Sequence, residues 1–205
     1  DSIGEKVEYA FSSKYGFLTA CPTNLGTGIR VSVMMHLPAL KMTDQLKKLF
    51  DAARDMNLTI RGLFGEGTEA IGDFFQISNQ VTLGISETRI VEDFQTILIP
   101  KIVEYERIAR DKLLVQEINL LDDKIARALA LLKSAKLISS HEAMFLLSNL
   151  RMGINMGRVK EISIETINEL FLLTQPAHLQ MNKGQTLNPE QRDILRAETL
   201  RAKLN

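Results

Sequence analysis

The sequence predicts an α+β fold in which a sheet-containing unit is followed by an all-helical C-terminal domain. Up to about residue 85, glycines separate short β-prone runs that surround one helical segment, a pattern compatible with an α/β or an α+β unit. From Ser86 onward glycine becomes rarer, and apolar residues recur at the three- and four-residue spacing of helices. The boundary is therefore expected near residue 114, which gives domains of 1–114 and 115–205.

The first unit contains four predicted strands and one predicted helix. The strands are the β-prone runs GFLTA (16–20), IRVSVMMHL (29–37), LTIRGLF (58–64) and DFFQISNQ (73–80). Between the second and third strands, apolar residues at helical spacing predict an amphipathic helix over 43–56, with Thr43 as its N-cap.

The second unit consists of successive predicted helices. The first runs from Ser86 past Pro100 towards Leu114. Later helices are expected over 116–134, 140–152, 163–173 and 189–203, with Ser140, Ser163 and Asn188 at N-cap positions. The apolar stripes of these helices fit either a core or a homodimer contact.

Composition limits the classes of function. Lys plus Arg and Asp plus Glu are both 25, so the chain has no global basic field for direct binding of nucleic acid or a membrane surface. A single cysteine, Cys21, excludes a disulfide framework, and the three histidines show no metal-ligand spacing. The sequence has no signal core and no apolar run of roughly 18 residues, so a cytoplasmic protein is expected. The first residue is not Met, which suggests either a piece of a longer protein or processing of the N-terminus.

Two glycine-rich loops are candidates for binding an anion. In CPTNLGTGIR (21–30), backbone amides could face phosphate, and Arg30 could bind its oxygens, although an ordinary hairpin with a solvated arginine fits as well. The second loop, RGLFGEGT (61–68), brings Arg61 near the carboxylate of Glu66. It lacks the GK[ST] ending of a Walker A loop, and its role is ambiguous by itself.

Both loops resemble those of the phosphagen (guanidino) kinases. CPTNLGTGIRVSV is similar to the family stretch CPTNLGT-x-x-R-A-S-V, and RGLFGEGTEA is similar to the family loop RGTRGE. Together with FQISNQVTLGISE and the helical sequence after it, the resemblance covers essentially the whole chain. It implies an antiparallel-sheet catalytic subdomain and phosphoryl transfer from ATP, with Mg²⁺, to a guanidino nitrogen.

The resemblance also implies which residues form the site. Glu66 would be catalytic by orienting the guanidinium, and Cys21 would be catalytic as a thiol that nearby cations keep ionised, with an inert buried cysteine as the alternative. Arg30 and Arg61 would clamp the phosphates, and no protein ligand is assigned to a metal. The residues implied for ATP binding are Arg30, Val31, Ser32, Val33, Met34, Arg61, Gly62, Leu63, Phe64, Gly65 and Glu66.

Two positions depart from the arginine-kinase pattern. Met34 stands where arginine kinases have a histidine on the adenine side, and Phe64 replaces the second arginine of the RGTRGE loop. Adenine recognition is therefore expected to depend more on apolar packing, with one phosphate contact fewer.

The C-terminal helix carries a motif of one branch of the family. Its string RDILRA (192–197) matches the RDxxRA motif of the bacterial protein-arginine kinases of the McsB type. The resemblance implies an allosteric phosphoarginine pocket formed by Arg192, Asp193, Arg196 and Ala197, in which the arginines hold the phosphoryl group and Asp193 binds the guanidinium. Without the resemblance, these residues fit an ordinary charge pair on a solvated helix.

The resemblance implies part of a protein-arginine kinase, which phosphorylates arginine side chains in proteins, marks those proteins for Clp-type degradation and relieves heat-shock repression. Implied partners are protein substrates such as a CtsR-type repressor, a McsA-type activator, the Clp unfoldase pathway and a second copy of the chain. Because the family places further site residues upstream, this chain alone is expected to be inactive or nearly so. The alternatives are a non-catalytic phosphoarginine-binding and dimerisation module, and a small-molecule arginine kinase, which the RDxxRA string disfavours.

Overall fold

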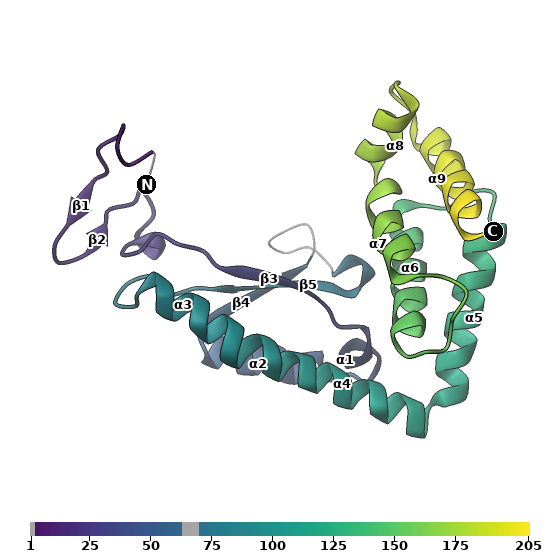
Figure 1. The fold of residues 1–205 in the computed structure, drawn as a ribbon, viewed down its shortest axis with the longest axis horizontal. Helices are drawn as coiled ribbons and strands as arrows, with labels where there is room; N and C mark the ends of the chain where they lie inside the picture. The colour runs from purple at the N-terminus through teal and green to yellow at the C-terminus, as the bar shows by residue number, and fades with distance from the viewer. Residues whose placement is uncertain (1–2, 63–69) are drawn as a thin grey trace.

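The computed structural model describes residues 3–62 and 70–205 and has the predicted α+β architecture. A three-stranded antiparallel sheet has the spatial order β3 (Ser32–His36), β5 (Phe74–Asn79), β4 (Leu58–Gly62). A hairpin of β1 (Phe11–Ser12) and β2 (Gly16–Phe17) lies at the opposite end of the molecule from the C-terminal helices (Figure 1).

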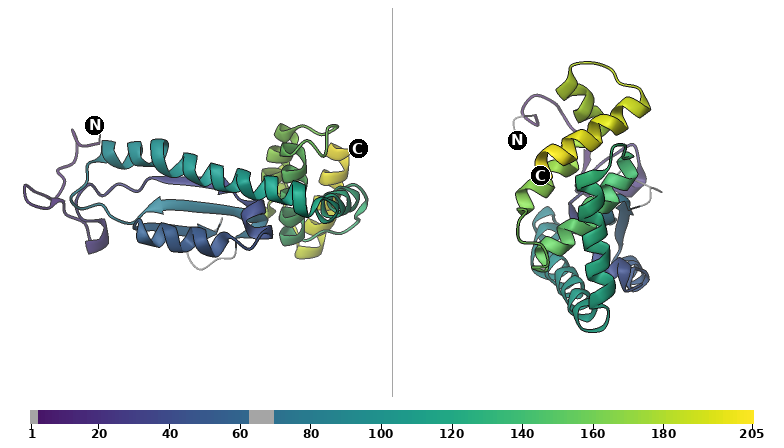
Figure 2. Two further views of the ribbon diagram at one scale, coloured as in Figure 1. Left: turned by 90° about the horizontal axis from the view of Figure 1, so that it is seen from below. Right: turned by 90° about the vertical axis from the view of Figure 1, so that its right-hand side faces the viewer.

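Helices cover one face of this sheet. They are α2 (Leu46–Asp55), α3 (Glu87–Asp93) and α4 (Ile99–Gln116). A π-helical turn, η3 (Phe94–Leu98), joins α3 to α4, and the resulting long rod lies on the same side of the sheet as α2 (Figure 2). Pro100 has no N–H to donate to the preceding turn. The π-helical turn η3 lies just before it and accommodates the missing hydrogen bond. The helix therefore continues past Pro100, as predicted.

The strand register explains why the helices pack on this face. Side chains alternate between the faces of a sheet, and the pairing places Val33, Ile77 and Ile60 in one row. Ile77 has no exposed surface, and the ring of Phe75 on the same face packs against Phe50 of α2 at 5.9 Å between centroids. Burial of each such side chain contributes roughly 1.5–3 kcal/mol. The opposite face carries the polar strand residues.

The remaining helices form a bundle at the other end of the molecule. They are α5 (Ile118–Ser134), α6 (Ser140–Asn155), α7 (Ile164–Leu173), α8 (Pro176–Lys183) and α9 (Pro189–Leu204). Leu147, Leu150 and Met152 of α6 are fully buried, so this stripe is core. Helix α6 also packs against the short helix η2 (Ile71–Asp73), which attaches the bundle to the sheet. None of the helices in the described ranges combines the length and apolarity needed to cross a bilayer.

Several predicted element boundaries were wrong. Thr43 is not the N-cap of the second helix, because it ends α1 (Pro38–Met42), a helix that the sequence did not predict, and Gln45 precedes α2. The hydroxyl that caps α6 belongs to Ser139 and not to Ser140. The expected strand over 16–20 ends at Phe17, and helix α8 was also missed.

The other two predicted N-caps are confirmed. Ser163 accepts a hydrogen bond from the Thr166 amide at the start of α7. Asn188 and Gln191 form a reciprocal capping box at the start of α9, at 2.9 and 3.0 Å. This box fixes the start of the helix that carries the RDILRA string.

Candidate functional site

The polar face of the sheet carries the two arginines that the sequence singled out. The register places Arg61 of β4 opposite Gln76 of β5, which in turn faces Met34 of β3. Arg30 lies two residues before Ser32, at the start of the same edge. Arg30 and Arg61 line one cleft of about 600 Å³, so the fold brings together two guanidinium groups from separate segments.

The loop between β2 and β3 forms another wall of this cleft. Pro22, Thr23 and Asn24 form the 3-10 helix η1 (Pro22–Asn24), and all three line the cleft. Thr82 holds this loop, because its hydroxyl is within hydrogen-bonding distance of Thr23 O at 3.2 Å and Leu25 O at 2.8 Å. A buried threonine after β5 therefore sets the height of the loop above the sheet.

Asn79 fixes the segment that leads to Arg30. Its Oδ1 accepts a hydrogen bond from the Val31 amide at 2.7 Å, and its Nδ2 donates to Ile29 O and Val81 O at 3.1 Å each. The amide thus occupies the backbone groups on both sides of Arg30. This arrangement limits the backbone freedom of Arg30 while leaving its side chain exposed.

Gly26 is required where the same loop approaches the sheet. Its φ is +108°, and a Cβ built there would lie 2.4 Å from Thr82 O. Gly26 also exchanges two backbone hydrogen bonds with Phe17, at 2.8 and 3.2 Å. Because an L side chain would meet rigid backbone, this position needs glycine.

Cys21 is exposed and begins the loop, although it is not among the residues that line the cleft. Its Sγ lies 2.9 Å from the Thr23 hydroxyl. Hydrogen bonds from the Thr23 side chain and backbone lower the pKa of the Cys21 thiol below its ordinary value. The cause of the lower pKa is thus Thr23, and not the nearby cations that the sequence suggested.

The other residues implied for ATP binding have varied positions. Ser32 is exposed on the polar face, where its Oγ accepts a hydrogen bond from Gln76 Nε2 at 3.0 Å, while Val33 packs into the core of the opposite face. Met34 is exposed and lines a different cleft, and Gly62 is buried. Four of the residues implied for ATP binding lie outside the described ranges: Leu63, Phe64, Gly65 and Glu66.

Arg196 of the RDILRA string is a buried structural cation. Its side chain is 1% exposed. Its Nε donates to Thr174 O and its Nη1 to Ile138 O, both at 2.8 Å, and Nη1 also reaches Asp193 Oδ1 at 2.5 Å. The guanidinium therefore joins α9 to two other segments of the bundle.

Arg192 and Asp193 are the accessible part of the string. Both are half-buried, and Arg192 Nη1 donates to Leu187 O at 2.8 Å. Ala197 is buried beneath them. Because Arg196 holds Asp193 by an ion pair, the orientation of this half-buried carboxylate depends on the buried guanidinium.

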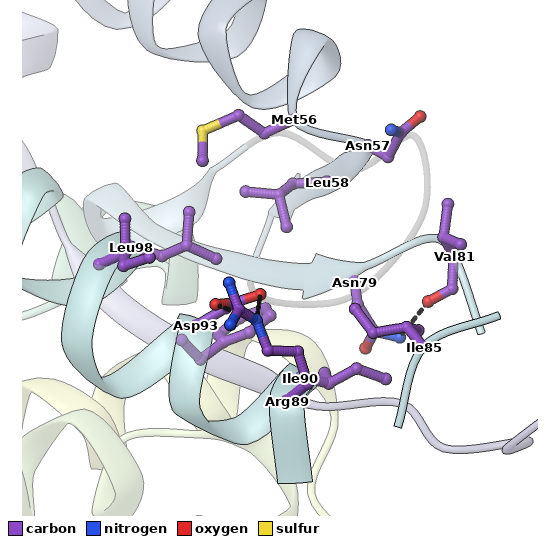
Figure 3. A pocket seen from close by; sticks show the side chains of 12 residues that line it. Met56, Asn57, Leu58, Asn79, Val81, Ile85, Arg89, Ile90, Asp93 and Leu98 are labelled. Carbon is purple, nitrogen blue, oxygen red and sulfur yellow. Dashed lines mark hydrogen bonds and ion pairs between the residues drawn. The ribbon is translucent and has the colours of Figure 1, made fainter. Parts of the chain in front are cut away.

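A further pocket of about 340 Å³ lies on the helical side of the sheet, between the end of α2 and α3 (Figure 3). Its lining is mainly apolar, including Leu58 and Ile90, with an ion pair between Arg89 and Asp93 at 3.0 Å. None of the sequence-predicted site residues lies in it.

A mixed unit with paired arginines on a polar sheet face, joined to a helical bundle, is the architecture of a guanidino phosphotransferase domain with a C-terminal extension. Residues 1–109 match the family model "ATP:guanido phosphotransferase, C-terminal catalytic domain", and the chain belongs to this family. Residues 118–205 match a second model, "Protein-arginine kinase McsB C-terminal domain".

Curated relatives agree with both matches. The chain is 48% identical over 205 residues to a protein-arginine kinase of Geobacillus sp. (strain WCH70), and 46% identical over 205 residues to that of Bacillus subtilis (strain 168). Each alignment covers 100% of this chain and 56% of the relative, so the chain spans about half the length of the proteins it matches. Among solved structures, the duplicated taurocyamine kinase from Schistosoma mansoni is 38% identical, with a TM-score of 0.47, over 52% of this chain and 14% of that chain.

Sequence reasoning did not assign a role to Asn79 or Thr82. Both lie in FQISNQVTLGISE, a segment that carries the family resemblance. Small polar residues at and just after the end of a predicted strand were the available signal, because such residues often bind backbone groups of neighbouring loops. Their partners, however, come from a loop about 50 residues earlier, which a local pattern does not reveal.

Proposed function

We propose that this chain is the C-terminal part of a protein-arginine kinase, which transfers a phosphoryl group from ATP to arginine side chains of proteins. The observation that carries the proposal is the pair of arginines, Arg30 and Arg61, that line one cleft on the polar sheet face. The family match and the names of the relatives support the same reaction.

The proposed role of this cleft is to bind the phosphates of the nucleotide. Phosphoryl transfer spreads negative charge over the migrating group, and guanidinium groups on a rigid sheet can neutralise this charge without rearranging. Mg²⁺ would neutralise more of it, held largely by the phosphates themselves, since this ion commonly binds through substrate phosphates and few carboxylates. Glu66 is proposed to orient the acceptor guanidinium; it lies outside the described residues.

Cys21 has a narrower proposed role. It stands next to η1, which lines the cleft, and its thiol has a lowered pKa. A thiol with more thiolate character at neutral pH could stabilise a cationic acceptor near the cleft. Cys21 is exposed, which supports a role for its thiol over that of a buried cysteine.

The helical bundle supports a second proposed function, allosteric binding of phosphoarginine. Arg192 and Asp193 are a half-buried cation and a half-buried carboxylate at successive positions of α9, and their charges are opposite to those of the phosphoryl and guanidinium groups of that ligand. We assign Arg196 a positioning role, because its own hydrogen bonds are directed to the protein. If the kinase activity belongs only to longer proteins, the chain would act as a phosphoarginine-binding and dimerising module.

The wider biological role is proposed from the family resemblance alone. We propose that the kinase is cytoplasmic and forms a homodimer. We also propose that it responds to stress by marking proteins for Clp-type degradation. Proposed partners are a CtsR-type repressor as substrate and a McsA-type activator.

The kinase assignment is tested in the full-length kinase that contains this chain. Arg30→Gln and Arg61→Gln are each expected to reduce phosphorylation of a protein substrate by about 10² or more, because each removes a charged contact to the phosphates. Arg89→Gln is the matched control, since it removes an arginine from an exposed ion pair on the opposite side of the sheet. Unchanged turnover in both cleft variants, with their folds intact by circular dichroism, would disprove the assignment.

A further inference from the structure

A second cleft lies where the open edge of β3 meets α4 and α6. Its volume is about 690 Å³. Its polar lining consists of three arginines, two carboxylates, a histidine and an asparagine: Arg107, Arg110, Arg151, Glu106, Asp111, His36 and Asn155. This cleft therefore lies between the sheet and the helical bundle, and it is separate from the cleft that Arg30 and Arg61 line.

The charges that line this cleft do not balance. Arg107 pairs with Asp111 at 3.4 Å, and Arg110 pairs with Glu106 at 2.8 Å. Arg151 has no carboxylate within ion-pair distance among residues 3–62 and 70–205; its Nε donates to the neutral Asn168 side chain at 3.1 Å, and its guanidinium lies over the Phe74 ring at 5.7 Å. Three cations thus face two anions, and the excess positive charge lies at Arg151.

The carboxylate of Glu106 binds two backbone amides as well as Arg110, so Arg110 keeps donors that can bind a ligand. Glu106 accepts hydrogen bonds from the Ala39 and Leu40 amides at 3.1 and 3.0 Å, so its charge is shared with the N-terminus of α1. Arg110 uses only its Nε towards Glu106, and within the described part of the chain its Nη nitrogens have no hydrogen-bond partner. Those nitrogens belong to a residue that lines the cleft.

The pKa of His36 is lowered by burial and by the positive charges in this cleft. Burial lowers the pKa of its imidazole well below the ordinary value, and the charges of Arg151 and Arg110 lower it further. Burial and the charge of Arg110 likewise lower the pKa of Arg151, so the two guanidinium groups that line this cleft repel each other. An anion placed between them would relieve this repulsion.

The imidazole of His36 is buried, and only one of its two ring nitrogens has a hydrogen-bond partner in the part of the chain that the structure describes. Ser148 Oγ donates to Asp73 Oδ2 at 2.5 Å and lies 2.8 Å from His36 Nε2, so Nε2 must carry the hydrogen of that bond. The second nitrogen, Nδ1, is buried and has no hydrogen-bond partner in the part of the chain that the structure describes. Beyond Ser148, Asp73 forms an ion pair with Lys41 at 2.6 Å.

We propose that this cleft is a second anion site, in which Arg110 and Arg151 bind a phosphoryl group between α4 and α6, next to His36. A phosphoryl dianion has three oxygens and can accept from two guanidinium groups on different helices, whereas a carboxylate offers two oxygens in one plane. The apolar side chains of Met34 and Phe74 line the same cleft and would contact the remainder of a phosphorylated molecule. The site is distinct from the proposed ATP and phosphoarginine sites in every charged residue.

The test uses the imidazole of His36 as a local reporter. The chain has three histidines, so the ring nitrogens of His36, His141 and His178 can be followed individually by NMR. Titration with inorganic phosphate is expected to shift the His36 resonances saturably and to raise the pKa of that imidazole, because an adjacent anion favours the imidazolium. The exposed His178 is the internal reference, and sodium chloride at equal ionic strength controls for screening.

Variants separate this site from the others. Arg151→Gln is expected to weaken phosphate binding, as reported by His36, by about tenfold or more. Arg61→Gln is expected to leave it unchanged even if it abolishes nucleotide binding, so failure of one proposal can be distinguished from failure of the other. If Arg151→Gln does not fold, the wild-type titration still decides. A His36 response that chloride reproduces, or one that persists in a folded Arg151→Gln protein, would overturn the proposal.

Titrations with different phosphorylated molecules show which kind of molecule carries the phosphoryl group that binds here. Phosphoarginine and AMP are titrated in the same way as phosphate. Tighter binding of phosphoarginine at His36 would assign the site to phosphorylated side chains, tighter binding of AMP would assign it to nucleotides, and equal binding would assign it to the free ion. Each of these results requires a phosphoryl site and so supports the proposal.

Discussion

Arg196 illustrates how a single residue can be prominent in sequence and yet be structural in the folded chain. The spacing of Arg192 and Arg196 places both on one helix face, which led to the expectation that both bind phosphate. The structure buries Arg196 against carbonyls of other segments, while Arg192 stays accessible. Burial of this kind depends on segments far from α9 in sequence, so no local pattern predicts it.

The two arginines should therefore respond differently to substitution. Arg196→Ala is expected to lower the free energy of unfolding by about 2–4 kcal/mol, because it leaves two buried carbonyls without a donor and breaks an ion pair whose carboxylate is half-buried. Arg192→Ala should cost about 1 kcal/mol or less but should abolish calorimetric binding of phosphoarginine. Urea unfolding and calorimetry on the same samples measure both effects. Unchanged phosphoarginine affinity in Arg192→Ala would contradict the pocket.

For the candidate ATP site, the sequence predicted the arginines that line the cleft but not the residues that orient them. Arg30 and Arg61 were identified from two glycine-rich loops and a family resemblance, and they do line one cleft. The support of Arg30 by Asn79 and the effect of Thr23 on Cys21 were not predicted, since both depend on hydrogen-bond geometry. Composition and motif spacing identify groups that can do chemistry, but not the neighbours that orient them.

At the scale of elements, long helices were predicted well and short ones were missed. Helix α1 has only five residues and begins with Pro38, a favourable first-turn residue. The buried amides of Ala39 and Leu40, in the first turn of the helix, are capped by Glu106, which lies 67 positions after Ala39. A helix that depends on such a distant cap cannot be recognised from its own sequence, and the predicted N-cap was consequently placed at Thr43.

The contact between α5 and α6 depends on one glycine. A Cβ on Gly153 would lie 2.7 Å from Ile125 Cγ2, so the two helices approach closely at this point. Gly153→Ala is expected to lower the free energy of unfolding by about 1–3 kcal/mol, despite the gain of up to about 1 kcal/mol in helix propensity.

A double-mutant cycle checks the cause of this loss. Ile125→Ala removes the atom that the new methyl group would meet, so the loss from Gly153→Ala should shrink markedly in that background. Equal losses in both backgrounds would show that the close approach is not what makes the substitution unfavourable.

At the scale of the whole molecule, a buried polar chain connects the sheet to the helical bundle. His36 of β3, Ser148 of α6 and Asp73 of η2 are linked by hydrogen bonds of 2.8 and 2.5 Å. Lys41 completes the chain through an ion pair with Asp73 at 2.6 Å. The sequence predicted a sheet unit and a helical unit but gave no sign of this link, because its members come from four separate segments.

This link should make the stability of the protein depend on pH. The pKa of His36 in the folded chain lies well below its ordinary value of 6.5, so the unfolded chain binds a proton first as pH falls. The contribution of His36 is therefore complete above pH 6.5 and decreases below it, by up to about 1.4 kcal/mol per pH unit. Glu106 acts in the opposite direction: burial raises the pKa of its carboxyl above 4.5, which favours the folded chain as that group takes up its proton.

A comparison of variants isolates the histidine from the carboxyl groups. His36→Gln keeps a donor for Ser148 but cannot be protonated, so its stability relative to wild type should rise steadily from pH 6.5 to pH 5. The pKa values of Asp122 and Glu161 are lowered from 3.8 and 4.5, so the stability these groups contribute is lost only at more acidic pH. His178→Gln, at an exposed site, should follow wild type throughout. Thermal unfolding midpoints across this range measure the difference; a constant offset between His36→Gln and wild type would show that His36 is not the group that titrates.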